Sequence, residues 1–259
     1  MFLAQAALVR LRTTIHNEAA MRPAKALFRV VPAAAAGLVI LMVFMGLAAC
    51  GGPSGDVDPK TILAEASAAM KKIQGFHFVY EVHKPASSEP GPGLEIARII
   101  GDVNAQGNMQ ASIDVTQGGI PLALKFVAVG DTHYIQDPLS QKWQSIAAKD
   151  SPVGTLNLSA GTIQILDEIS DASFVGEESK GGTTTYHITG KVAAKEVAAI
   201  AGAVSTDNTF PTDVWVGVSD SLVYEVDIAG AATPTEDPEI RRSIALSNLD
   251  KFVDIKPPQ

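Results

Sequence analysis

The stretch FHFVYEVHK, residues 76–84, decides the fold class because its side chains alternate with a period of two. One face of the extended chain is apolar, and the opposite face carries His77, Glu81 and His83. Such alternation predicts a β-strand with one buried and one solvent-facing side. The apolar face consists of Phe76, Phe78, Tyr80 and Val82.

Strand patterns recur along the rest of the chain, joined by connections that are too short for parallel crossovers. They therefore predict antiparallel pairing, beginning with a meander of five or six strands. In LVYEVDIAG, residues 222–230, the alternation predicts that Tyr224 and Val226 face the same way as Leu222 and Ile228. The further predicted strands are 94–103, 110–116, 122–128, 132–136, 143–146, 173–177, 183–189, 212–218, 222–229 and 241–252.

Three helices are predicted between these strands. The first begins at Asp58-Pro59, a capping residue followed by a first-turn proline, and ends at Gly75. The second spans 159–170 with Ser159 as its cap, and the third is the alanine-rich segment 193–204. The fold class is therefore α+β, a large curved antiparallel sheet (a half-barrel) wrapped over a few helices. Either the sheet flattens onto these helices, or a hydrophobic cavity remains between them.

The only cysteine lies in LVILMVFMGLAACGGPSG, residues 38–55, where an apolar run meets a glycine-rich polar stretch. Small residues directly before Cys50 match a bacterial lipobox, in which the cysteine sulfur receives a diacylglyceryl group and the preceding bond is cut. Residues 1–49 are thus predicted to be a signal peptide. Residues 50–59 form the lipidated cysteine with a flexible tether, and 60–259 a single domain. The lipobox residues are Leu47, Ala48 and Ala49.

An uncleaved transmembrane helix is the alternative for the uncharged run Val30–Ala49, which is long enough to span a bilayer. Both interpretations send the chain after Cys50 across the membrane, since basic residues precede the run. We therefore expect a protein anchored to the cell membrane on its extracytoplasmic face. Residues 1–20 are too long and mixed for a signal n-region, so we expect translation to start at Met21.

The charge balance argues against nucleic acid as a partner. The whole chain has a formal net charge of −8, and removal of residues 1–49, with five Lys or Arg and one Glu, lowers it to −12. An acidic surface favours neither nucleic acid nor broad adhesion to anionic lipids. Attachment to the membrane must then come from the lipid on Cys50. We expect a monomer.

Residues arranged for catalysis or metal binding are not evident in the sequence. His77 and His83 share a strand face but lie six residues apart, about 20 Å along an extended strand, so they cannot share a metal ion. The sequence contains no HExxH, CxxC, EF-hand or GxSxG motif. We therefore predict a protein that is not an enzyme and has neither a metal site nor a cofactor.

Five segments of the chain, in this order, resemble the mycobacterial LppX/LprA/LprF/LprG lipoprotein family, and the wider architecture is similar to the LolA/LolB carriers. The resemblance covers essentially the whole chain after Cys50, although the family often has tryptophan and proline where this chain has Leu249 and Phe252. The segments are ILAEASAAMKKIQGFHFVYEV (62–82), THYIQDPLSQKWQSI (132–146), TTYHITGKVAAKEVAAI (184–200), PTDVWVG (211–217) and SIALSNLDKFVDIKPP (243–258).

The resemblance implies a half-barrel sheet around a hydrophobic cavity that binds acylated lipids or glycolipids and carries them through the envelope, with a lipid exporter as a possible partner. A non-catalytic scaffold or signalling lipoprotein with a solid core is the alternative. In the carrier interpretation, inward strand faces line the cavity; in the alternative, the same side chains are filled core. The candidates are Phe76, Phe78, Tyr80, Ile113, Val115, Leu124, Phe126, Val216, Tyr224 and Val226.

Overall fold

The computed structural model describes residues 58–259, except 87, 89–93, 152, 154, 155, 202, 203 and 206. The predicted signal peptide, its lipobox, Cys50 and the tether up to residue 57 therefore lie outside the described residues. Among the residues described, no helix is both long and apolar enough to cross a membrane.

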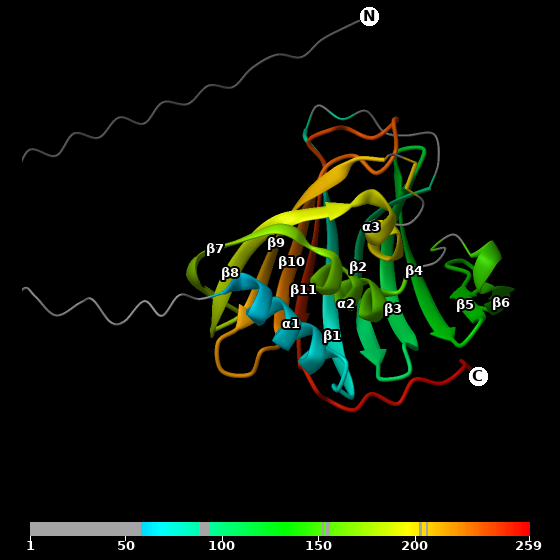
Figure 1. Ribbon diagram of the computed structural model, residues 1–259. Helices are drawn as coiled ribbons and strands as arrows, with labels where there is room; N and C mark the ends of the chain where they lie inside the picture. Colours follow the sequence, from blue (N-terminus) through cyan, green and yellow to red (C-terminus); the bar gives the residue numbers. More distant parts are fainter. Residues whose placement is uncertain are drawn as a thin grey trace, which may run out of the picture. The chain divides into compact units, whose positions relative to one another are not determined.

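One antiparallel sheet of eleven strands forms the framework, in the order β6-β5-β4-β3-β2-β1-β11-β10-β9-β8-β7. The fold class predicted from the sequence, a large curved antiparallel sheet over a few helices, is confirmed (Figure 1). The strands are β1 (Gly75–His83), β2 (Leu94–Asn104), β3 (Met109–Gln117), β4 (Ile120–Val129), β5 (Thr132–Gln136), β6 (Trp143–Ala147), β7 (Ser170–Lys180), β8 (Thr183–Ala193), β9 (Thr209–Gly217), β10 (Val223–Ala229) and β11 (Arg241–Ser247).

Two meanders, β1–β6 and β7–β11, build the sheet, and each contains only neighbours in sequence. They are joined where β1 pairs antiparallel with β11, with Phe78 opposite Leu246 and Tyr80 opposite Ile244. This pairing places the first and last strands of the chain in the centre of the sheet. Strands β6 and β7 are its two edges, and the sheet is not closed between them.

The helices are α1 (Pro59–Met70), α2 (Leu158–Glu168) and α3 (Ala194–Ala201), with a short 3₁₀ helix η1 (Ala148–Asp150). All three α-helices lie on one face of the sheet (Figure 1). Helix α2 lies in the connection between the two edge strands β6 and β7, so the chain must cross the face of the sheet there.

The structure corrects several predicted boundaries. Asp58 caps α1 as predicted, by accepting from the N–H groups of Lys60 and Thr61, but the helix ends at Met70 and Gly75 already belongs to β1. The cap of α2 is Asn157 rather than Ser159, because the Asn157 side chain accepts from the N–H of Ala160. An asparagine is as good a cap as a serine, so both positions fitted the sequence.

The predicted last strand, 241–252, is too long, because β11 ends at Ser247. Asn248 and Asp250 follow with φ of 49° and 59°, a left-handed conformation that interrupts a strand. The Asp250 carboxylate accepts from the N–H of Gln74, 2.9 Å away, at the start of β1. The final segment of the chain then runs along the end of the sheet at which β1 begins (Figure 1).

Candidate functional site

The candidate site is the apolar interior between the curved sheet and the helices. Eight of the ten residues proposed from the sequence belong to one contiguous hydrophobic cluster, and each is at most 4 % exposed. Leu124 is partly buried against this cluster, as its inward position on β4 predicts. The eight residues are Phe76, Phe78, Tyr80, Ile113, Val115, Phe126, Val216 and Val226.

Tyr224 does not join the cluster, so the predicted alternation of β10 is wrong at this residue. The pairing of β10 with β9 shifts register between Val223 and Glu225, and Val223 takes the fully buried position instead. The Tyr224 hydroxyl donates to Asp220 in the β9–β10 turn, 2.9 Å away, and partial burial raises the pKa of this phenol. A β-bulge cannot be recognised from the alternation of side chains in a sequence, which explains why Tyr224 was predicted to face inward.

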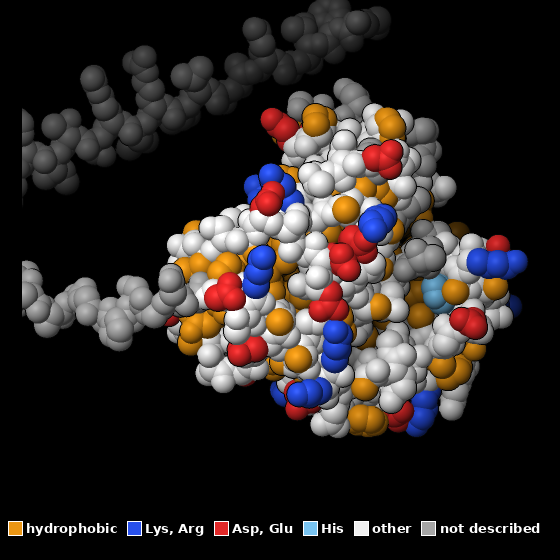
Figure 2. Space-filling view, in the orientation of Figure 1, with side chains coloured by type: hydrophobic (Ala, Val, Ile, Leu, Met, Phe, Trp, Pro, Cys, Tyr) orange, Lys and Arg blue, Asp and Glu red, His pale blue; other side chains and the backbone are white. Residues whose placement is uncertain are grey.

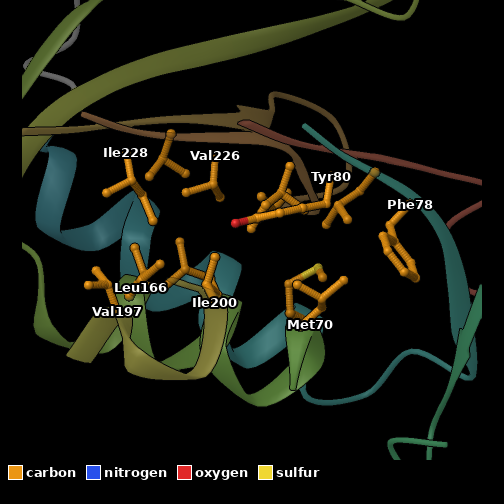
Figure 3. Close-up of a cluster of buried hydrophobic side chains, with 14 of the residues drawn as sticks. Met70, Phe78, Tyr80, Leu166, Val197, Ile200, Val226 and Ile228 are labelled. Atoms are coloured by element: carbon orange, nitrogen blue, oxygen red, sulfur yellow. The ribbon is translucent and has the colours of Figure 1, made fainter. Parts of the chain in front are cut away.

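The three helices supply the opposite wall of the interior. Met70 of α1, Leu166 of α2 and Ile200 of α3 point towards the sheet, and Tyr80 and Val226 point towards the helices (Figure 3). The helix residues belong to the same cluster as the strand residues. Contacts between helices and sheet are concentrated on β7, β8 and β9. The inner face is therefore apolar on both sides.

Close packing and polar contacts hold the helices together. Gly161 of α2 lies so close to α3 that an added Cβ would be 2.7 Å from Cγ1 of Ile200. The Ser67 hydroxyl of α1 donates to Asp167 of α2 at 2.5 Å, and Lys71 pairs with the same carboxylate at 3.0 Å. These contacts, led by the Ser67 bond, lower the pKa of Asp167. The helices thus form one layer.

A charged side chain also lies on the inner face of the sheet. Arg242 of β11 is opposite Ile228 and Val82, which places it on the buried side. Its guanidinium donates to the Gly230 carbonyl at 3.1 Å and to Glu236 at 2.6 Å. The inward position of Arg242 could have been predicted from the alternation along RRSIALS, residues 241–247. Residues 242, 244 and 246 share one face of the strand, and all three are buried.

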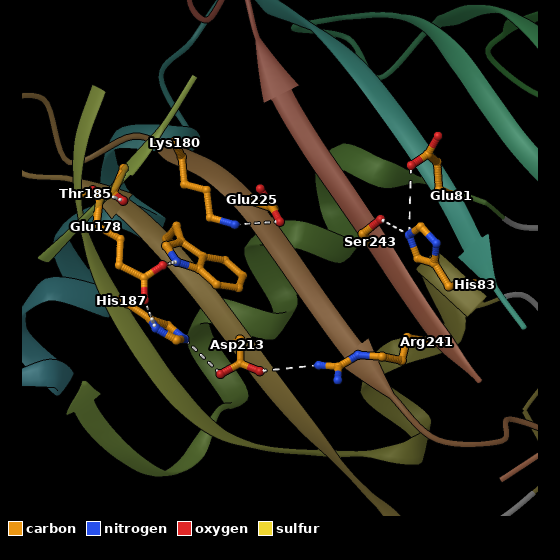
Figure 4. A network of polar contacts seen from close by, with 11 residues as sticks. Glu81, His83, Glu178, Lys180, Thr185, His187, Asp213, Glu225, Arg241 and Ser243 are labelled. Carbon is orange, nitrogen blue, oxygen red and sulfur yellow. Dashed lines mark hydrogen bonds and ion pairs between the residues drawn. The ribbon is translucent and has the colours of Figure 1, made fainter. Parts of the chain in front are cut away.

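The outer face of the sheet is polar. His187 bridges Glu178 and Asp213, each at 2.9 Å, while Lys180 pairs with Glu225 at 2.8 Å (Figure 4). Trp215 lies between these groups, with its indole N–H donating to Glu178, its ring stacked on His187 at 4.5 Å, and the Lys180 amine 3.7 Å above it. Trp215 is therefore buried by outer-face side chains.

The outer-face histidines have different partners, since His77 contacts Asp102 and His83 contacts Ser243. No group of three or more His, Cys, Asp or Glu residues within the described part of the chain could hold a metal ion. On the face that carries the helices, exposed apolar side chains occur in small groups among charged ones (Figure 2). On this face, the described apolar side chains are therefore not gathered into one large patch.

Comparison with known proteins identifies the family. The sequence matches the LppX_LprAFG lipoprotein family over residues 58–255. The chain belongs to this family. The resemblance predicted from the sequence is therefore confirmed, and the match begins at the residue that caps α1.

Among family members, the lipoarabinomannan carrier protein LprG of Mycobacterium tuberculosis is 28 % identical over 170 residues, which cover 64 % of this chain and 69 % of LprG. Lipoprotein LprA of Mycobacterium tuberculosis is 27 % identical over 240 residues, covering 85 % of this chain and 94 % of LprA.

Solved structures of two family members share the fold. LprF from Mycobacterium bovis superposes with a TM-score of 0.61 at 17 % identity, covering 77 % of this chain and 96 % of LprF. LppX from Mycobacterium tuberculosis gives a TM-score of 0.51 at 22 % identity, covering 77 % of this chain and all of LppX.

Proposed function

We propose that this LppX_LprAFG lipoprotein binds acylated lipids or glycolipids between its helices and its sheet and carries them through the cell envelope without chemical change. The observation that carries the proposal is the single apolar cluster formed by both layers on the concave side of an unclosed sheet. The relative LprG is a lipoarabinomannan carrier protein, which supports the same class of ligand.

The energetics of acyl chains suit such a site. Each buried CH₂ group contributes about 0.8 kcal/mol, so two chains in an apolar interior are held firmly. In the structure, side chains of the helix layer and the sheet contact one another. Where the two layers touch, at β7, β8 and β9, a bound acyl chain would replace apolar contacts between their side chains.

The anchor is a separate part of the proposal. Transfer of a diacylglyceryl group to the Cys50 sulfur, followed by cleavage of the bond before Cys50, holds the domain at the extracytoplasmic face of the cell membrane, since this group supplies two acyl chains. The acidic domain then stays near lipid without adhering to it through charge. Metabolic labelling with palmitate tests this step. We expect label on the full chain and none on Cys50→Ala, whereas equal labelling would contradict it.

The decisive experiment uses residues 50–259 with Cys50→Ala, so that no covalent lipid is present. We expect native mass spectrometry of the purified protein to show a co-purified lipid, and a fluorescent fatty acyl probe to bind and be displaced by that lipid. If no lipid is found and no apolar probe binds, the carrier proposal fails and the scaffold interpretation replaces it.

A further inference from the structure

A depression lined by aromatic and polar side chains lies on the outer face of the β5–β6 hairpin. Tyr134 is on the same face as His77, because directly opposed residues connect the two across β2, β3 and β4. Trp143 of β6 is opposite Gln136 and shares that face. The volume of the depression is about 570 Å³, which is within the range of small-molecule sites. Its walls include Tyr134, Gln141, Lys142, Trp143, Ser145 and Gln259.

Trp143 differs from the other tryptophan, Trp215, in what surrounds it. The indole N–H of Trp215 donates to Glu178, and its ring is covered by His187 and Lys180. Trp143 is only partly buried, and within the described part of the chain its N–H has no hydrogen-bond partner and its ring no aromatic or cationic neighbour. Both its ring and its N–H are therefore available to a ligand.

The polar groups around the two rings suit an uncharged ligand rich in hydroxyl groups. Tyr134 and Ser145 each offer a hydroxyl that no other described residue bonds. Gln141 keeps its amide oxygen as an acceptor, because its amide nitrogen donates to the Pro138 carbonyl at 2.8 Å. The described lining residues include one cation, Lys142, and no Asp or Glu side chain. This set favours neither a metal ion nor a ligand with several negative charges.

The loop between β5 and β6, which forms the rim of the depression, is ordered by the protein's own hydrogen bonds. The Asp137 carboxylate accepts from the N–H groups of Leu139 at 3.1 Å and Ser140 at 2.6 Å. The Gln136 side-chain amide donates to the Gln141 carbonyl at 2.9 Å. A site whose shape is fixed before binding loses little conformational entropy when a ligand enters.

The position of the hairpin connects this depression with the interior between sheet and helices. Strands β5 and β6 lie at one margin of the sheet, and β6 pairs with no strand beyond it (Figure 1). Ile135, which follows Tyr134, is opposite Phe126 and packs against the interior cluster. A molecule whose acyl chains lie inside can therefore pass around the single strand β6 and place its head group on the outer face.

We propose that Tyr134 and Trp143 bind a sugar ring of a glycolipid head group on the outer face of the β5–β6 hairpin. The inference rests on the proposed function and adds a saccharide site to it. One face of a hexose ring presents C–H groups, and the electron-rich face of an aromatic ring attracts them. The hydroxyl groups at the rim of the sugar match the hydroxyl and amide groups of the depression.

The test compares a diacylglycerol with the same lipid carrying a hexose disaccharide, so that the acyl chains contribute equally. The protein is residues 50–259 with Cys50→Ala. We expect the glycolipid to bind about tenfold more tightly, and Trp143→Ala to remove this gain without changing the affinity for diacylglycerol. Tyr134→Phe keeps the ring but loses one hydrogen bond, so it should weaken glycolipid binding by about fivefold.

Phe252→Ala is the matched control, since it removes an aromatic ring that is 71 % exposed and lies outside the depression. The indole ¹⁵N–¹H resonances provide a second readout. The Trp143 signal should shift with the glycolipid and not with diacylglycerol, and the Trp215 signal should stay in place with both. If Trp143→Ala keeps the wild-type ratio of glycolipid to diacylglycerol affinity, this inference is wrong and the carrier function stands. If the unaltered domain binds neither lipid, the proposed function itself fails.

Discussion

Arg242 Nη2 lies 2.6 Å from Glu236 Oε1, and the arginine side chain is only 4 % exposed. Glu236 belongs to the connection between β10 and β11, and its second oxygen accepts from the N–H of Ala232 at 2.6 Å. The pair therefore ties residues 230–240 to the inner face of the sheet. It also neutralises a charge that would otherwise be buried alone.

Replacement of Glu236 by leucine should be strongly destabilising, because it leaves the Arg242 charge buried and unpaired. We expect a loss of about 3 to 5 kcal/mol in the free energy of unfolding, measured by urea denaturation. The double variant Glu236→Leu/Arg242→Met should recover most of this loss. Lys256→Met breaks the exposed pair with Asp254 and serves as the control, with a change below about 1 kcal/mol. Equal effects at the two pairs would refute the role given to burial.

Gly101 of β2 should not tolerate a side chain. A Cβ there would lie 2.2 Å from the carbonyl oxygen of Gln110 on β3, so the backbone itself would have to move. We expect Gly101→Ala to cost about 1 to 3 kcal/mol by thermal or chemical unfolding. Gly176→Ala on β7 is the matched control, because nothing lies within 4 Å of its Cβ position. The control should be neutral or stabilising by up to about 1 kcal/mol.

The bond from Ser67 to Asp167 should make the helix layer sensitive to acid. Because the folded-state pKa of Asp167 is lowered, its contribution is complete above the ordinary aspartate pKa and is lost as the pH falls through the folded value. At pH 7 we expect Ser67→Ala to cost about 1 kcal/mol. The same comparison below pH 3 should show a smaller difference. In an Asp167→Asn background the serine substitution should lose this pH dependence; if it does not, another group is responsible.

Leu124 gives a direct test of where lipid binds. Its side chain is partly buried against the interior cluster, so a tryptophan there would occupy space on the inner face. We expect Leu124→Trp to weaken binding of a fatty acyl probe by about tenfold, with the domain still folded by circular dichroism. Ala123→Trp, one residue earlier on the exposed side of β4, should leave binding unchanged. A binding site on the outer face would give the reverse result.

Local patterns predicted the elements of this fold, because eleven strand segments and three helices each carry their own periodicity and turn residues. The pairing of β1 with β11 had no such signal, as the two strands are far apart in sequence and meet only through the folded sheet. Errors arose where the backbone departs from regular geometry, at the bulge beside Tyr224 and at the left-handed residues after Ser247.

The inner-face residues were predicted where apolar side chains alternate cleanly, as in 76–84 and 110–116. His133 was missed for the opposite reason. In THYIQ, residues 132–136, neither face is clearly apolar, so the sequence does not indicate which face of the sheet His133 occupies. Its inner-face position is evident only from its neighbours Phe126 and Ala128 in the structure. A polar residue among apolar ones weakens the alternation from which a buried face is predicted.

The absence of pairing between β6 and β7 has a mechanical consequence. A sheet that closes on itself has a circumference set by strand number and stagger. Here the edge strands β6 and β7 do not pair, so the curvature of the sheet can change through small changes of strand twist. The hydrogen bonds between neighbouring strands are kept during such a change. Under the proposed function, bending of this one continuous sheet would accommodate lipids of different size.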